Sequence, residues 1–305
     1  MTDKIGRLAL IGVGLINGSL SLALQKRGLV ADVVGCARNA ETRERAIERG
    51  LCAHAEADPA AAVQDADIVV LGVPPGAIGP VAEAMAPGLG ANTIVTDVAS
   101  IKAHVVDVVR PHLPNPALFV PGHPVAGTEH SGPDAAFDSL FERRRGILTP
   151  LADADPGAVT RIRQMWEAVG MSIDLMTPNH HDKVLAITSH IPHLIAYSIV
   201  GTVGDLEDQT QSEVFRYAAG GFTDFTRIAA SDPVMWRDVF LHNQDAVLEM
   251  LGRVTEDLIA LQRSIRWGEG DRLEDLFIRT RGLRRGVIQA GEAYVRQAED
   301  PLAEQ

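Results

Sequence analysis

The sequence has few cysteines and no excess of positive charge. Its 305 residues include only two cysteines, Cys36 and Cys52, and no Cys-x-x-Cys pair, so we expect no disulfide framework, and a reducing cytoplasm suits the chain. Against 40 Asp and Glu it has 28 Lys and Arg, a net charge of −12. This balance argues against nucleic acid or an anionic membrane as a partner, but a local basic pocket for an anionic substrate remains compatible with it.

Long apolar runs are also missing. The apolar stretch 8–24 has no cleavage-site pattern, and its glycines have the spacing of a dinucleotide-binding loop, so we interpret it as part of the fold and not as a signal peptide. No other run reaches the roughly 18 residues of a membrane span, so we expect no membrane segment. A hydrophobic content of 46% over this length predicts two domains with sizeable cores.

A glycine-rich loop follows the first apolar segment. Residues 7–11 predict a buried strand, and the loop 12–18 (Gly-Val-Gly-Leu-Ile-Asn-Gly) leads into an amphipathic helix expected from Ser19 to about Arg27. This order is typical of a Rossmann phosphate site, in which Gly12 makes the tight turn, Gly14 lets the backbone approach a pyrophosphate, and the helix N-terminus supplies N–H groups. Asn17 stands where the third glycine usually lies. A glycine turn without a ligand is the alternative.

Further apolar segments predict strands of the same parallel sheet. They are residues 32–37, 68–73, 94–97 and 118–120, and 146–149 is expected to close the sheet. The loops after these strands meet at one edge, where ligands bind in open α/β sheets. We therefore expect Val73, Pro74 and Ser100 to lie near the nicotinamide, and Ser100 could also cap the helix that follows it.

The end of the second strand carries the signal for cofactor choice. An NAD-binding site usually has an acidic side chain there for the ribose 2′-hydroxyl. This chain has Ala37-Arg38-Asn39 instead, and the only nearby acid, Asp32, is at the start of the strand. Arg38 favours NADP+, whose 2′-phosphate it would bind; a solvated loop arginine is the alternative.

His123 is the candidate catalytic base. It stands in Gly122-His123-Pro124, after the apolar run 118–120, so a backbone with little freedom holds it at the carboxyl end of a strand. A histidine titrates near physiological pH and can accept a proton there.

Beyond Asp153 the pattern changes to helices. Apolar positions from Phe240 to Ile265, with Asn243 as one polar member, predict one long amphipathic helix, and residues 273–290 predict a second. Seams of this length are usually buried against a partner, so we expect a homodimer through the helical domain. The fold class is therefore α/β, with a Rossmann-type dinucleotide-binding domain at 1–151 and an all-α dimerisation domain at 152–305.

Three stretches in the helical region carry polar or aromatic residues suited to binding. They are Ser189-His190-Ile191-Pro192-His193, expected at a helix start, residues 220–229 with Arg227, and residues 232–238 with Trp236. A metal site at His190 and His193 lacks a further ligand at zinc spacing, so we expect no metal. An ion pair of Arg227 with Asp224, and core packing of Trp236, are the alternatives to substrate contact.

Taken together, these motifs resemble the prephenate/arogenate (cyclohexadienyl) dehydrogenase family of tyrosine biosynthesis. The matching pieces are residues 12–18, 97–102, 122–129, 147–150, 189–193 and 220–236, in the family's order over nearly the whole chain. The resemblance implies a Rossmann domain, a helical dimerisation domain and oxidative decarboxylation of prephenate or arogenate with NAD(P)+.

The resemblance also implies roles for single residues. The catalytic histidine falls on His123, the orienting serine on Ser100 and the carboxylate-binding arginine on Arg227. The gating acids fall on Glu129 and Asp224. The substrate contacts fall on Ser189, His190, His193 and Trp236. Thr223 lies where some relatives carry a basic residue, which leaves recognition of the substrate's side-chain carboxylate open, and with it the choice between prephenate, the commoner bacterial-type substrate of the family, and arogenate.

We expect the cofactor to contact Gly12, Gly14, Leu15, Ile16, Asn17, Arg38, Val73, Pro74 and Ser100. Two alternatives remain: a β-hydroxyacid dehydrogenase or imine reductase, which pairs the same two kinds of domain, and a non-catalytic NADP(H) sensor on the same fold.

Overall fold

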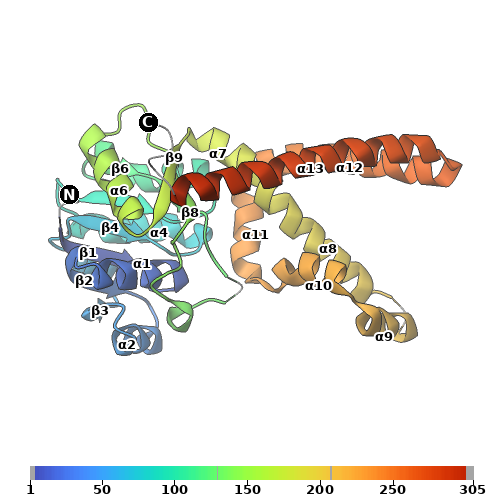
Figure 1. The fold of residues 1–305 in the computed structure, drawn as a ribbon. Coiled ribbons are helices and arrows are strands. Elements are labelled where there is room, and N and C mark those ends of the chain that lie inside the picture. Colours follow the sequence, from blue (N-terminus) through green and yellow to red (C-terminus); the bar gives the residue numbers. More distant parts are fainter. Residues whose placement is uncertain (1–3, 129, 207, 300–305) are drawn as a thin grey trace. The chain divides into compact units, whose positions relative to one another are not determined.

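The computed structural model describes residues 4–128, 130–206 and 208–299, and its first part is a doubly wound parallel sheet (Figure 1). The six strands pair in the order β3-β2-β1-β4-β5-β6, all parallel, which is the order of a Rossmann dinucleotide-binding sheet. The strands are β1 (Ile5–Ile11), β2 (Val30–Cys36), β3 (His54–Glu56), β4 (Ile68–Leu71), β5 (Ile94–Asp97) and β6 (Phe119–Val120). The predicted Rossmann-type part is confirmed.

Each face of this sheet has its own hydrophobic core. Leu8 and Leu10 of β1 belong to one core, and Ala9 and Ile11 to the other. A strand buried on both faces has a continuous apolar sequence, as β1 does. Helices of the first core are α1 (Leu15–Lys26), α2 (Ala40–Glu48) and α6 (Pro156–Ala168); those of the second are α3 (Pro59–Ala62), α4 (Pro75–Met85), α5 (Ala103–Val109) and α11 (Pro233–His242).

A second, three-stranded sheet carries the candidate base. In it, β7 (Gly122–Pro124) pairs antiparallel with β8 (Arg144–Leu148), and β8 pairs parallel with β9 (Met171–Leu175). The prediction that 146–149 closes the main sheet is therefore wrong. Pro121, which has no N–H to donate, separates β6 from β7 and ends the first ladder there. The expectation of helices alone beyond Asp153 is also wrong, because β9 is a strand.

The domain boundary predicted after residue 151 stays a prediction. Two elements beyond it pack with the Rossmann part, since β9 pairs with β8 and α6 contributes Ile162, Met165 and Trp166 to the first core. These contacts favour a boundary just before α7 (Pro178–Leu185), the first helix of the helical region.

A continuous helix from Pro178 to Gly204 is formed by α7, a π turn (Ala186–His190) and α8 (Ile191–Gly204). The helix predicted to start around Ser189–Pro192 is α8, which has Pro192 in its first turn, but a π turn joins it to α7 without a break. The π turn ends one residue before Ile191-Pro192, where the proline ring would clash with the carbonyl four residues earlier in a regular helix. Among the described residues this is the one helix long and apolar enough to cross a membrane, with a mean hydropathy of 1.4. It carries buried polar side chains bonded to the Rossmann part, described below, so we interpret it as a core helix.

The remaining helices of this part are short. They are α9 (Asp208–Tyr217), α10 (Gly220–Thr226) and α11, which is followed by a break at Asn243. The single helix predicted from Phe240 is thus wrong, because Asn243 has φ −114° and ψ 35° and separates α11 from α12 (Gln244–Trp267). Its side-chain amide bonds two buried groups of the helix 178–204 instead, an alternative to helical bonding that asparagine favours.

Residues from Leu248 onward form a second compact unit. It contains most of α12 and all of α13 (Gly270–Glu299), joined by a turn in which Gly268 has φ +68°. The predicted second helix is confirmed. Apolar residues of the predicted seam are solvent-exposed within one chain: the exposed fractions are 56% for Leu258, 67% for Ile265 and 66% for Leu283.

Candidate active site

The glycine turn has room for a pyrophosphate. Gly12 has φ +89°, and a Cβ added there would lie 2.5 Å from the carbonyl oxygen of Gly72, so only glycine fits. A Cβ at Gly14 would meet no atom within 4 Å, and no side chain caps α1 at this residue. The first N–H groups of α1 therefore face open space, as an anion site at a helix N-terminus requires. The residues present fit a dinucleotide.

Asn17 stands where the third glycine of the motif usually lies, and its side chain stabilises the turn through hydrogen bonds. Its side chain is buried, and its amide nitrogen donates to the carbonyl oxygens of Gly12 (2.8 Å) and Val70 (3.2 Å). The amide thus ties the glycine turn to β4. The close packing that the third glycine of the motif usually allows is found at Gly18 instead, where an added Cβ would lie 2.8 Å from the Cβ of Ala136. The bonds of the Asn17 amide therefore hold the glycine turn in place.

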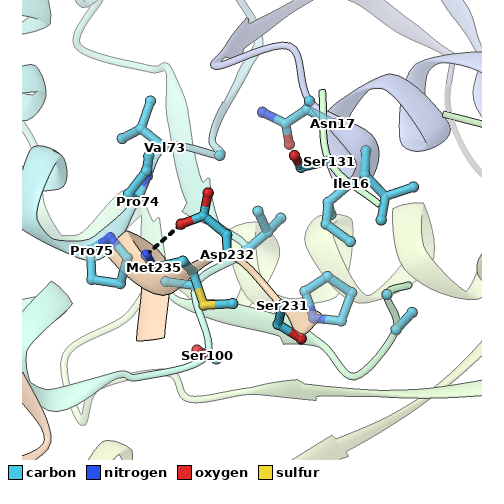
Figure 2. Close-up of a pocket in the computed structure, with 18 of the residues that line it drawn as sticks. Ile16, Asn17, Val73, Pro74, Pro75, Ser100, Ser131, Ser231, Asp232 and Met235 are labelled. Atoms are coloured by element: carbon cyan, nitrogen blue, oxygen red, sulfur yellow. Dashed lines mark hydrogen bonds between the residues drawn. The ribbon is translucent and has the colours of Figure 1, made fainter. Parts of the chain in front are cut away.

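A cavity of about 480 Å³ opens at the carboxyl edge of the sheet. Figure 2 shows Ile16 and Asn17 of α1, and Val73, Pro74 and Ser100 of the loops after β4 and β5, around it. Ser231, Asp232 and Met235, from the start of α11, face them across the same space. The cavity wall also includes Gly14, Leu15, His123, Ser189 and Trp236. Predicted cofactor and substrate residues therefore converge on one cavity.

His123 is the first member of a buried hydrogen-bonded chain. Its Nδ1 lies 2.8 Å from Nε2 of His181, and Nδ1 of His181 lies 2.8 Å from Oδ1 of Asp182. His181 and Asp182, both on α7, are buried. Asp182 also accepts the backbone N–H groups of Lys102 (2.7 Å) and Ala103 (2.9 Å), so its carboxylate caps α5.

This chain determines which nitrogen of His123 is free. A carboxylate only accepts, so Nδ1 of His181 donates to Asp182, and Nε2 of the neutral ring is an acceptor. His123 must then donate from Nδ1, which leaves its Nε2 as a bare acceptor. His123 lines the cavity. The lone pair on its Nε2 is the group that a base needs to accept a proton.

Electrostatics keep both rings neutral. Burial lowers the pKa of His123 well below the usual value, and His181, Lys102 and His190 lower it further. Burial likewise lowers the pKa of His181, although the bond to Asp182 works against this. Burial would raise the pKa of Asp182, but its bonds from His181 and from the α5 backbone hold it below the usual value. His123 is therefore a neutral acceptor at neutral pH.

A buried ion pair, Lys102 with Asp97, bonds the backbone of Gly122, the residue before His123. Lys102 and Asp97 are both fully buried and bonded to each other. Lys102 Nζ also donates to the carbonyl oxygen of Gly122 (2.6 Å), and Asp97 Oδ1 accepts the N–H of Gly122 (3.1 Å). The pair thus holds both sides of one glycine, where an added Cβ would lie 3.0 Å from the carbonyl oxygen of Asp97.

Ser100 lines the cavity but does not cap a helix. α5 begins at Ala103, and the carboxylate of Asp182 provides the cap, so the predicted capping role of Ser100 is wrong. The loop position predicted for Ser100 near the reacting groups agrees with its place in the cavity wall.

Trp236 joins the predicted histidines to the cavity. Its ring stacks on His193 with centroids 3.7 Å apart, and His190 meets it edge-on at 6.0 Å. Neither histidine is in the described cavity wall. His190 is fully buried and its Nδ1 accepts the amide of Asn243 (3.1 Å), and His193 Nδ1 donates to the carbonyl oxygen of Ser189 (2.9 Å). Trp236 is buried in the second core and also lines the cavity, so core packing of its ring does not exclude contact with a ligand.

The other predicted substrate residues lie outside the described cavity wall. Arg227, Thr223 and Asp224 are exposed, and the hydroxyl of Thr223 bonds carbonyls of its own helix. Arg227 is close enough to lower the pKa of His193, after the larger effect of burial. Glu129 falls outside the described residues.

Sequence reasoning missed His181, Asp182 and Asn243 as site residues. The run His180-His181-Asp182 is a visible cluster of polar groups, but only the fold shows that His180 is exposed while its two neighbours are buried. The role of the Lys102 and Asp97 side chains was also missed, although both are in a matched motif.

The edge of β2 presents Arg38 to solvent. Arg43 of α2 donates to the carbonyl oxygens of Ala37 (2.7 Å) and Arg38 (2.8 Å), and Asn39 caps α2 through the N–H of Glu41 (2.9 Å). The turn is therefore rigid, and the guanidinium of Arg38 projects from a fixed backbone.

Comparisons with known proteins cover nearly the whole chain. Residues 20–175 match the family model for the nucleotide-binding domain of prephenate dehydrogenase, and residues 177–279 match the one for its dimerisation domain. The chain is 41% identical over 270 residues to a cyclohexadienyl dehydrogenase from Zymomonas mobilis, across 88% of this chain and 92% of that one. It is 33% identical over 288 residues to prephenate dehydrogenase from Bacillus subtilis, across 94% of this chain and 77% of that one.

Solved structures agree with these matches. The structure of prephenate dehydrogenase from Aquifex aeolicus in complex with hydroxyphenyl propionate and NAD+ has a TM-score of 0.84 and 31% identity, covering 94% of this chain and 99% of its own. Arogenate dehydrogenase from Synechocystis has a TM-score of 0.77 and 31% identity, covering 92% and 99%.

Proposed function

Because the chain belongs to the prephenate dehydrogenase family of NAD(P)-dependent enzymes of tyrosine biosynthesis, we propose that His123 is the base that takes the proton from the substrate's ring hydroxyl. One observation carries this proposal. The chain from Asp182 through His181 leaves Nε2 of a neutral His123 as an acceptor at a cavity that the glycine turn shares. Family membership and the enzyme activity it brings decide against a β-hydroxyacid dehydrogenase and against a sensor.

The reaction follows from this placement. NAD(P)+ held at the glycine turn, beside Gly12 and Gly14, would supply hydride-accepting chemistry for the ring carbon that carries the hydroxyl. His123 takes the hydroxyl proton as the C–H bond breaks, and Ser100 orients that oxygen. The dienone so formed takes the electron pair of the bond to the ring carboxylate, CO2 leaves and the ring becomes aromatic. The proton on His123 then returns to the phenolate oxygen. Aromatisation makes the sequence irreversible.

The substrate we propose is prephenate, with arogenate as the alternative. Its ring would lie among Ser100, His123, Ser189 and Trp236, which share the cavity wall. Arg227 would bind a carboxylate, since a guanidinium fork matches that group. We keep Asp224 and Thr223 of α10 and the two histidines on Trp236 as further contacts. The relative solved with hydroxyphenyl propionate, an aromatic acid, supports a substrate of this shape.

We also propose NADP+ as the preferred cofactor, a homodimer through the C-terminal helices, and a cytoplasmic location. Arg38 supports the first, because residues 36–39 at the end of β2 include no acidic side chain. The match to a dimerisation domain supports the second. The two cysteines support the third, since both are buried and free, and burial raises the pKa of Cys36 to about 11.

The test of the base is His123→Asn, assayed by NAD(P)H absorbance with prephenate or arogenate and either cofactor. We expect kcat to fall by about 10²- to 10⁴-fold, because proton removal loses its acceptor. Cofactor affinity should stay unchanged. His180→Asn is the matched control, since His180 is the exposed neighbour of His181 and should behave as the unaltered enzyme does. A near-normal kcat for His123→Asn contradicts the proposal.

The pH profile of the unaltered enzyme gives a second readout. A base must be neutral to act, so kcat/KM falls as the pH drops through the pKa of His123 in the free enzyme. Because burial and Lys102 lower that pKa, the acid limb should lie well below the ordinary histidine range near pH 6.5.

A further inference from the structure

We propose that Lys102 and Asp97 are positioning residues for His123: the buried pair holds the Gly122–His123 peptide, and the charge of Lys102 keeps the ring in its proton-accepting form. This inference rests on the proposed base role of His123. It extends that role to two side chains that touch neither substrate nor cofactor.

The pair bonds both peptide units of one residue, Gly122, which directly precedes His123. Lys102 Nζ donates to the carbonyl oxygen of Gly122, which belongs to the peptide bond with His123, and Asp97 Oδ1 accepts the N–H of the same glycine. Asp97 Oδ2 accepts the N–H of Ala99 as well (2.9 Å), so the carboxylate also fixes the loop that carries Ser100. One ion pair therefore sets the backbone of the proposed base and of the proposed orienting hydroxyl.

The burial of the pair argues for a role beyond stability. Both side chains have an exposed fraction of 0%, and burial raises the pKa of Asp97 and lowers that of Lys102. Three donors on the carboxylate oppose this effect: Lys102 Nζ and the N–H groups of Ala99 and Gly122. Burying an ion pair is rarely the most stabilising choice for a core, so its placement beside His123 suggests another use.

Among the described residues, the titratable groups that act on His123 and His181 come from three segments. His181 and Asp182 come from α7, His190 from the π turn, and Lys102 with Asp97 from the β5–α5 segment. Lys102 is among the causes that lower the pKa of both His123 and His181, whereas Asp97 raises that of His181 and is the last of its causes. The positive end of the pair is thus the one that opposes protonation of His123.

The experiment compares Lys102→Met with the charge-balanced variant Lys102→Met/Asp97→Asn, and uses Lys26→Met, a surface lysine of α1, as the matched control. Folding is checked by circular dichroism, and NAD+ binding by calorimetry. The pKa of His123 is measured by ¹⁵N NMR of histidine-labelled protein, with the resonance assigned through His123→Asn. The kcat/KM profile against pH is then recorded for each folded variant.

We expect both variants to lower kcat by about 10²-fold, the cost of an ångström-scale misplacement of a catalytic group, with NAD+ affinity retained. The pKa of His123 and the acid limb of kcat/KM should both rise, by about one unit, because a nearby positive charge is gone. Lys26→Met should change neither. The inference is overturned if kcat falls only in proportion to the fraction of unfolded protein while the acid limb and the NMR titration do not shift. The pair would then be merely structural.

The experiments distinguish failure of the base role of His123 from failure of the positioning role of Lys102 and Asp97. If His123→Asn keeps a near-normal kcat, the base role falls, whatever the Lys102 variants do. If His123→Asn is inactive but the Lys102 variants titrate and turn over normally, only the present inference falls. If neither variant folds, Asp97→Asn is the second test, because it keeps Lys102 and removes the carboxylate that accepts the Gly122 N–H. A kcat lowered about 10²-fold in folded protein supports the inference, and a normal kcat overturns it.

Discussion

Arg38 occupies the place at the end of β2 where an acidic side chain would bind the ribose of NAD+. It is exposed on a turn that Arg43 holds rigid. Arg38→Ala should weaken NADP+ binding by about 10- to 100-fold, the value of a charge-assisted hydrogen bond to phosphate, and leave NAD+ binding unchanged. Calorimetric titration with both cofactors measures this. Equal loss for the two cofactors would mean that Arg38 supports the turn and does not choose the cofactor.

Arg227 tests how the substrate carboxylate is held. It is exposed outside the described cavity wall, yet close enough to His193 to affect its pKa. Arg227→Ala should raise KM by about 10- to 100-fold with kcat within a few-fold of normal, because the lost contact is made in the ground state as well as in the transition state. Arg216→Ala, a change of an exposed arginine on α9, should leave KM unchanged. An unaltered KM for Arg227→Ala would assign the arginine a structural role.

Among single residues of the candidate site, those at strand ends are easier to predict from the sequence than those on helices. His123 and Ser100 follow apolar runs, and parallel strands must bring their carboxyl ends to one edge, so topology alone places both at the cavity. His181 and Asp182 are on α7, far along the chain. Their burial depends on the docking of α7 beside α5, a tertiary contact that no local pattern encodes.

At the scale of elements, predictions failed because local periodicity does not show the tertiary partners of a segment. Asn243 fits the apolar seam by spacing, but its amide bonds the carbonyl of Asp182 and the ring of His190, and the helix breaks there. Pro192 does lie in the first turn of α8, but the local pattern did not show the π turn that joins α8 to α7. The apolar run 146–149 looks like another parallel strand, but it returns antiparallel to β7.

Two carboxylates of the helical region cap helices of the Rossmann part. Asp182 accepts the first N–H groups of α5, and Asp238 of α11 accepts the N–H of Gly76 at the start of α4 (3.2 Å). A Cβ at Gly76 would lie 2.7 Å from the Asp238 carboxylate, so the glycine permits the approach. Each cap contributes about 1 kcal/mol and also fixes the loops of the cavity, which lie just before α4 and α5. The same contacts therefore join two regions of the chain and shape the site.

At the scale of the whole molecule, the exposed apolar side chains of α12 and α13 call for a partner surface. Leu258, Ile265 and Trp267 of α12, and Phe277 and Leu283 of α13, are all more than half exposed in one chain. Apolar side chains gathered in this way on a monomer mark an interaction site. The match to a dimerisation domain makes a second copy of this chain the partner that we propose.

We expect the double variant Leu258→Lys/Phe277→Lys to be a monomer at concentrations where the unaltered protein is a dimer. Burying each of these side chains is worth about 1.5–3 kcal/mol, and a dimer would lose four of them, so its affinity should fall by about 10⁴-fold or more. Analytical ultracentrifugation measures the change, and circular dichroism checks that the helices remain. Glu256→Lys places the same lysine at an exposed polar position of α12 and should leave the dimer intact. If the unaltered protein sediments as a monomer, or if the double variant still sediments as a dimer, these helices are not the interface.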